Sequence, residues 1–287
     1  MPRLAPNVLR AASGVALLAL LQACSPLAGP GPQTPDRREV AVAVTQSNQL
    51  IRFNAARPDR LLSRRPLTGL QPGEQVLGLD YRVKGDVLYA LGSSQRLYTV
   101  DVDSGAVTAV GAPFAIALQG SDFGFDFNPA VDRIRVVSDR GQNLRLHPDT
   151  GAVAATDATL AYAPADTAPR TPQVSAAGYT YNPDEDKLTT NYAIDLRVGT
   201  LVLQGSREGQ TPVISPNTGQ LRTVGSLGLG PLEDASFDIS DVRNTPLAAL
   251  RVAGQTRLYL LNLNTGQASL LGIVHDGRAL WGMAIEP

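Results

Sequence analysis

Apolar and polar residues alternate with a period of two along most of the chain after Val40. Runs such as Val87–Ala90 and Arg96–Val100 are rich in β-branched and aromatic residues, and Gly, Ser or Asp bounds each run. No segment after Val40 carries apolar residues at positions i, i+3, i+4 and i+7 behind a capping residue, which is the pattern of an amphipathic helix. The alternation therefore predicts an all-β protein made of short strands.

The predicted strands recur in groups of four. A strand with a small first residue begins at five places, 46 to 58 residues apart: GLDY at Gly78, GFDF at Gly124, GYTY at Gly178, SFDI at Ser236 and GMAI at Gly282. In four groups an Asx-x-Gly turn precedes the last strand, because Asp or Asn opens such a turn and Gly supplies the positive φ that closes it. The unit is a four-stranded antiparallel blade, and its length is close to the roughly 40–50 residues of a propeller blade.

The two ends of the chain complete the pattern. The last strand, Leu280–Ile285, is a first strand of a group with no partners after it. Three N-terminal strands lack a first strand before them: Val40–Gln46, Gln49–Asn54 and Leu61–Leu67. Pairing of the two ends predicts a β-propeller of about five four-stranded blades, closed by the C-terminal strand, and favours it over an open sandwich or two small β-domains. Two insertions, Asp157–Ser175 and Gly205–Pro216, interrupt the repeat and are candidate binding loops.

The N-terminal region has the features of an export signal. Arg3 and Arg10 lie before an apolar stretch, Ala11–Leu21, that is too short for a stable membrane anchor. Cys24, the one cysteine of the chain, follows Leu21-Gln22-Ala23, and this boundary resembles the lipidation site of bacterial lipoproteins; the alternative is an ordinary secretory signal that contains a cysteine. We expect lipidation at Cys24, on the outer membrane if the cell has one. The predicted organisation is a signal peptide at 1–23, a flexible tether at 24–38 and a single propeller domain at 39–287.

Composition and motifs give little support to nucleic-acid binding or to catalysis. The chain has 25 Lys and Arg residues against 26 Asp and Glu residues, so no dominant basic surface is expected. The histidines, His147 and His275, lack partners at the spacing of a zinc site or a triad, and there is no GxSxG elbow and no phosphate-binding loop. A glycosidase with paired carboxylates stays open, because such pairs meet only in space.

Three aspartates occupy the third place of a first strand. They are Asp80, Asp126 and Asp238, whereas Thr180 and Ala284 stand at that place in the other groups. First strands surround a propeller axis, so the three carboxylates are expected at one depth of one channel and are candidate ligands for Ca²⁺ or another hard cation. The alternative is that each carboxylate bonds backbone amides and fixes one blade against the next, since a buried carboxylate must be paired or bonded in either case.

Three arginines form a candidate ligand-binding set, Arg133, Arg135 and Arg145. Arg133 and Arg135 share a strand face, and guanidinium groups on one face would clamp a carboxylate or phosphate. The alternative is that they form ion pairs between blades. The expected partners are then Asp122, Asp126, Asp132 or Asp139.

Three runs of sequence resemble the bacterial domain-of-unknown-function family 4394 over most of Leu50–Pro287: LGLDYRVKGDVLYALGSSQRLYTVDVDSG, GFDFNPAVDRIRVVSDRGQNLRLHPDTG and LYLLNLNTGQASLLG. The resemblance implies secreted or surface-attached propeller-like repeat proteins without an established activity, so no catalytic residue carries over. We expect a lipid-anchored, extracytoplasmic binding or scaffolding module for a protein, glycan or other envelope ligand, without catalysis. The alternatives are a hydrolase, glycosidase or esterase-like, acting on envelope or extracellular polymers, and a purely structural envelope protein.

Overall fold

The computed structural model describes residues 1–2, 37–168 and 171–287. Cys24, the predicted signal peptide beyond its first two residues, and most of the predicted tether lie outside the described residues. Residues 37–168 and 171–287 belong to one compact unit. In the described part of the chain, no helix is long and apolar enough to cross a membrane.

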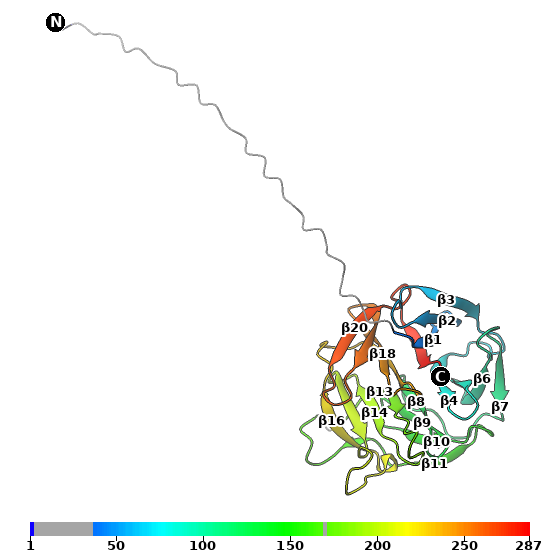
Figure 1. Cartoon of the computed structure of the whole chain (residues 1–287). Helices are drawn as coiled ribbons and strands as arrows, with labels where there is room; N and C mark the ends of the chain where they lie inside the picture. Colours follow the sequence, from blue (N-terminus) through cyan, green and yellow to red (C-terminus); the bar gives the residue numbers. More distant parts are fainter. Residues whose placement is uncertain (3–36, 169–170) are drawn as a thin grey trace. The chain divides into compact units, whose positions relative to one another are not determined.

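The fold is an all-β propeller of five blades, arranged as a ring in Figure 1. Blade 1 contains β21 (Leu280–Ile285), β1 (Val40–Thr45), β2 (Gln49–Asn54) and β3 (Leu61–Pro66). Blade 2 contains β4 (Val76–Arg82), β5 (Val87–Gly92), β6 (Arg96–Val100) and β7 (Val107–Val110). Blade 3 contains β8 (Phe123–Asn128), β9 (Arg133–Ser138), β10 (Asn143–Leu146) and β11 (Val153–Thr156). Blade 4 contains β13 (Val174–Tyr179), β14 (Asn191–Asp195), β15 (Thr200–Gln204), β16 (Gln220–Ser226) and β12 (Ala161–Tyr162). Blade 5 contains β17 (Asp234–Ile239), β18 (Pro246–Val252), β19 (Gln255–Leu261) and β20 (Ala268–Ile273).

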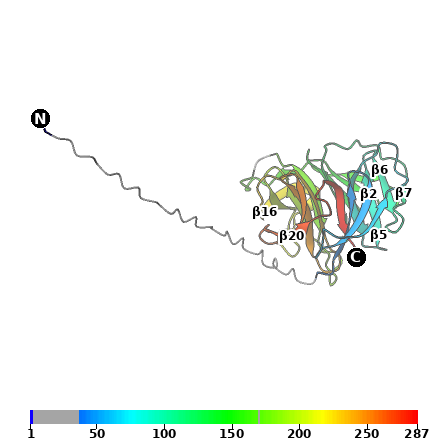
Figure 2. The ribbon, with the colours of Figure 1, turned by 90° about the horizontal axis from the view of Figure 1, so that it is seen from above.

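Closure of the ring follows the prediction from the two chain ends. Strand β21 pairs antiparallel with β1, with Ala41 opposite Ile285 and Ala43 opposite Met283. Figure 2 shows the red C-terminal strand beside the blue N-terminal strands of the same blade. This pairing covers the inner edge of β1 with β21, so the two ends of the chain hold each other in place.

The core lies between the blades and explains the two kinds of strand pattern. In blade 1, Ala43 and Ile51 pack towards Leu258 of blade 5, while Val44 and Leu50 pack towards blade 2. Inner strands such as β1 are therefore buried on both faces and nearly continuously apolar. Outer strands such as β20 face solvent along much of their length.

Blade 4 departs from the predicted repeat. The insertion 157–175 is not entirely loop, because β12 pairs in parallel with β16 at the outer edge of the blade. Strand β13 ends at Tyr179, so Thr180 lies beyond the first strand in which the sequence pattern placed it. A β-bulge interrupts the pairing of β13 between Val174 and Ala176, and Ser175 is the extra residue. The single helix among the described residues is the short 3₁₀ turn η1 (Pro216–Thr218).

Candidate functional site

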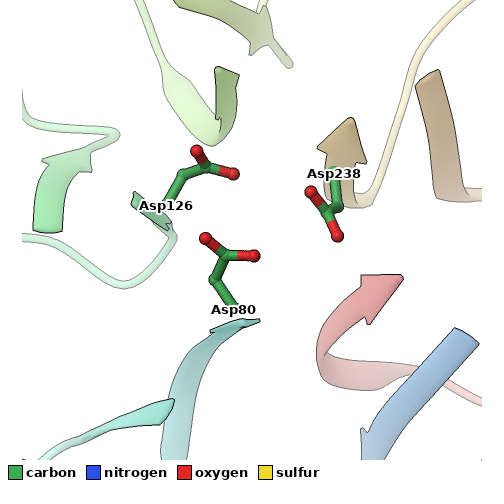
Figure 3. Close-up of side chains that lie close together, drawn as sticks. All are labelled: Asp80, Asp126 and Asp238. Carbon is green, nitrogen blue, oxygen red and sulfur yellow. The ribbon is translucent and has the colours of Figure 1, made fainter. Parts of the chain in front are cut away.

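Three carboxylates meet at the centre of the propeller. Asp80, Asp126 and Asp238 project from β4, β8 and β17, the innermost strands of blades 2, 3 and 5, and turn towards one another (Figure 3). One ligand oxygen of each lies within 4.8 Å of those of the other two, and each residue is at most 5% exposed. The expectation that the strand repeat places them at one depth is confirmed. We call this set the carboxylate ring.

Each carboxylate of the ring ties its blade to the next one. The acceptor bonds run in one direction around the axis: Asp80 accepts the backbone N–H of Phe127 (2.6 Å), Asp126 that of Tyr179 (3.0 Å) and Asp238 that of Ile285 (2.5 Å). A buried N–H without an acceptor is costly, so these bonds hold the innermost strands in register. The predicted structural role of the carboxylates is thus visible in their contacts.

In blade 4, the residue equivalent to the ring aspartates differs from the one that the sequence repeat predicted. Because Tyr179 donates to Asp126 as Phe127 donates to Asp80, the residue level with Asp126 is Gly178 and not Thr180. The pattern GYTY matched the repeat two residues too late, since alternation along a strand is unchanged by a shift of two.

Two blades contribute no carboxylate at this level, Gly178 in blade 4 and Ala284 in blade 1. The backbone N–H groups that would donate to carboxylates at these two places donate instead to an aspartate of their own strand. Tyr81 donates to Asp80 of its own strand at 2.8 Å, and Ile239 donates to the preceding Asp238. Three carboxylates therefore accept one backbone N–H from the innermost strand of each of the five blades.

Burial disfavours the charged form of the aspartates in the carboxylate ring. Desolvation raises the pKa of Asp80 and Asp126 well above the usual range, and the neighbouring carboxylates raise both further. Burial also raises the pKa of Asp238 to about 6. Bound protons or a bound cation would relieve this charge, and three oxygens this close suit the oxygen-rich coordination that Ca²⁺ prefers. Ca²⁺ binding at the ring stays a prediction.

Arg135 is the centre of a buried polar network and not an exposed clamp. Its side chain is 2% exposed and contacts four side chains: the hydroxyl of Tyr179 (2.6 Å), Asn143 (2.5 Å), Asp157 (3.1 Å) and Asn217 (2.6 Å). Asn217 and Tyr179 belong to blade 4, so Arg135 joins blades 3 and 4. The sequence predicted other acids as its partners, and this was wrong because Asp157, directly after β11, lies beside it in the same blade.

The other two arginines of the predicted set lie in different surroundings. Arg145 binds Asp157 with two hydrogen bonds of 2.9 Å, from the solvent side of the same network. Arg133 donates to the backbone carbonyl of Asp132. The structure brings Arg135 and Arg145 together on one carboxylate, which leaves Arg133 apart. Binding of an anionic ligand by the three stays a prediction, and at Arg135 the internal bonds oppose it.

A small cavity opens on the axis at the face where the innermost strands begin, which we call the entry face. Its volume is about 60 Å³, and strands of all five blades line it. The polar groups at its wall include Asp122 of blade 3, Ser175 of blade 4 and Asp234 of blade 5. Sequence reasoning missed these three residues as a site.

A signal for two of them was present in the sequence. Asp122 and Asp234 each stand four residues before a member of the carboxylate ring, Asp126 and Asp238, and so share its strand face. Desolvation, followed by the charge of Asp122, raises the pKa of Asp234 to about 6, and burial also raises the pKa of Asp122. Ser175 carries no comparable signal, because a bulge positions it.

Comparison with known proteins identifies the family of the chain. The family model described as "Domain of unknown function (DUF4394)" matches residues 49–284, and the chain belongs to this family. No curated protein matches the sequence. Among solved structures, the chain is similar to a chain of a nidogen/laminin complex at 12% identity and a TM-score of 0.48, over 87% of this chain and 98% of that one. It is similar to a putative 6-phosphogluconolactonase from Bacteroides uniformis at 17% identity and a TM-score of 0.40, over 88% and 72% of the two chains. Neither similarity bears on function.

Proposed function

We propose that this member of the DUF4394 family is a non-catalytic binding module, held outside the cytoplasm by a lipid on Cys24, and that it engages an envelope ligand at the entry face. The observation that carries the proposal is the axial cavity, at which the beginnings of the innermost strands present carboxylates and hydroxyls around one opening. Rigid scaffolds with convergent polar groups in a concave site are typical of ligand recognition.

The arrangement of the titratable groups supports binding over catalysis. Among the described residues, neither histidine hydrogen-bonds to a hydroxyl group: His147 accepts the N–H of Asp149 within its own turn, and His275 lies 3.9 Å from the neighbouring Asp276. A nucleophile that is activated by a base needs such a contact.

The alternative, a hydrolase, has its best location in a second cavity between blades 1 and 5. This cavity has a volume of about 260 Å³, and Ser47, His275 and Asp276 line it. A panel of ester and glycoside substrates separates the two functions. Turnover that His275→Ala abolishes while the protein stays folded would establish the hydrolase, and the absence of turnover on every substrate supports binding.

Sedimentation with purified cell envelope tests the binding face. The labelled propeller, residues 34–287, is suitable because its five core clusters lie within residues 41–285. We expect saturable binding that Asp122→Lys at the entry face weakens at least tenfold. Asp86→Lys is the matched control, because Asp86 is exposed in the turn after β4, at the opposite end of the innermost strands. Absence of binding, or equal loss in the two variants, would contradict the proposal.

The lipid anchor has its own test. Cys24→Ser should move the full-length protein from the membrane fraction to the soluble fraction and remove the mass of the acyl chains. If the variant stays in the membrane fraction with an unchanged mass, the prediction of lipidation is wrong.

A further inference from the structure

Three polar side chains from consecutive blades surround the mouth of the axial cavity. Asp122 lies directly before β8, Ser175 lies in β13 and Asp234 begins β17, so the three follow one another around half of the ring. Contacts between β13 and both β8 and β17 place the strand of Ser175 between the other two. The set lies about 13 Å from the carboxylate ring along the strands, because four residues separate the levels and each rises roughly 3.3 Å.

Ser175 is the observation that indicates a ligand. The residue is 2% exposed and belongs to the lining of the cavity, and its buried Oγ has no hydrogen-bond partner among the described residues. A buried hydroxyl without a partner destabilises a protein, so such a group requires an explanation. The β-bulge at Ser175 interrupts the regular alternation of β13.

The two carboxylates of the mouth lack a compensating cation. Asp122 accepts a hydrogen bond from the Ser121 hydroxyl at 3.0 Å, and Asp139 adds a second negative charge near it. Arg251 lies near Asp234, but its salt bridge is with Glu233 at 3.2 Å. Among the described residues, no Lys, Arg or His forms a salt bridge with Asp122 or Asp234. Arg251 lowers the pKa of Asp234 only from beyond salt-bridge distance, so no ion pair neutralises either carboxylate within the described residues.

The size and the lining of the cavity select the class of ligand. A volume of about 60 Å³ accommodates an ion with a few water molecules, since one water needs roughly 10–15 Å³ of such space. Carboxylate and hydroxyl oxygens together with water are the ligands of hard divalent cations, and Ca²⁺ tolerates an irregular set of six to eight such oxygens.

We propose that Asp122, Ser175 and Asp234 form a Ca²⁺ site at the mouth of the axial cavity. The ion replaces the missing positive charge, provides the hydroxyl of Ser175 with a partner, and links blades 3, 4 and 5 at the entry face. The site would supply the proposed binding face with a cation that an anionic envelope polymer can share. The contacts of the site do not depend on the lipid anchor or on that polymer.

Calorimetric titration of chelator-treated residues 34–287 with CaCl₂ tests the site, with the thermal midpoint as a second readout. We expect one site with a dissociation constant of roughly 10⁻⁴–10⁻³ M, as in extracellular Ca²⁺ modules. Asp234→Asn should weaken binding at least tenfold. Asp126→Asn is the matched control, because it removes one carboxylate from the carboxylate ring and leaves the mouth intact. Loss of binding in Asp126→Asn but not in Asp234→Asn would place the ion at the ring and overturn the proposal, as would absence of heat in the wild type.

Ser175→Ala should change the melting temperature in opposite directions with and without Ca²⁺. In EDTA the variant should melt at the same temperature as the wild type or higher, because it loses an unpaired buried hydroxyl. With saturating Ca²⁺ the order should reverse, because the wild type gains more from the ion. An unchanged order would show that the hydroxyl has no part in cation binding. Envelope sedimentation reports separately on the proposed function, so the two can fail independently.

Discussion

Replacing Arg135 by methionine removes the polar centre of the contact between blades 3 and 4 with little change in volume. The guanidinium group donates to four buried or partly buried side chains, of which Asp157 is charged. After the substitution, Asp157 keeps its two bonds from Arg145, while Asn143, Asn217 and the hydroxyl of Tyr179 each lose a donor. Arg145→Met is the matched control, because it removes the other arginine from the same carboxylate.

The structure predicts different magnitudes for the two substitutions. Breaking a buried, hydrogen-bonded charge pair from one side costs about 3–5 kcal/mol, because the remaining groups stay buried without partners. Arg135 is 2% exposed and Asp157 is 7% exposed, but Asp157 keeps Arg145 as a partner, so we expect the lower end of this range, about 3 kcal/mol. Arg145 is 30% exposed, and a pair at such a position contributes about 1 kcal/mol or less. For a domain of this size the difference corresponds to roughly 2–4 °C in the melting temperature for each kcal/mol.

Urea unfolding followed by tryptophan fluorescence and far-ultraviolet circular dichroism measures both variants. We expect the Arg135→Met midpoint to fall well below that of Arg145→Met, with both variants folded in the absence of urea. If Arg135→Met loses no more stability than Arg145→Met, the network does not hold the blades together. The hypothesis that the three arginines serve an external anionic ligand would then regain support.

Two further predictions concern the innermost strands. Burial raises the pKa of the aspartates in the carboxylate ring, so the folded protein holds more protons than the unfolded chain. The contribution of these aspartates to the stability of the fold therefore falls as the pH rises from about 4 through about 6 and beyond. Asp126→Asn, whose amide oxygen can still accept from Tyr179, should therefore gain stability relative to the wild type between pH 5 and pH 8 in EDTA, and a pH-independent difference would contradict this. Gly124→Ala should destabilise the protein by about 1–3 kcal/mol in thermal unfolding, because a Cβ there would lie 2.8 Å from the backbone of Ala176 and Ala177 in blade 4. Ser236→Ala, at the equivalent place of blade 5, is the control and should change stability by less than about 0.5 kcal/mol.

The sequence by itself determined where the strands of this protein lie, because the signals for strands are local. The strands Gln49–Asn54 and Arg96–Val100 have the predicted bounds, because alternation and turn residues act within a few positions of the chain. The blade count and the closure by β21 followed from the repeat and from the unpaired strands at the two ends. The convergence of the carboxylate ring followed as well, because equivalent positions of a repeat lie at equivalent depths.

Tertiary structure alone decided the partner of Arg135 and the level of blade 4 in the ring. Asp157 reaches Arg135 from the position directly after β11, where its N–H donates to the carbonyl of Asn143, and the predicted partner list did not include it. The two-residue shift in blade 4 was hidden because alternation is the same after every second residue.

The residues at the mouth of the axial cavity also come together only in the tertiary structure. Ser175 lines it because a bulge breaks the alternation, and Asp234 acquires its raised pKa from burial and from Asp122 in a different blade. The sequence determines which face of a strand each residue takes and where the chain turns. The positions, burial and charges that form a site arise only when the ring closes and brings strands from distant parts of the chain around one axis.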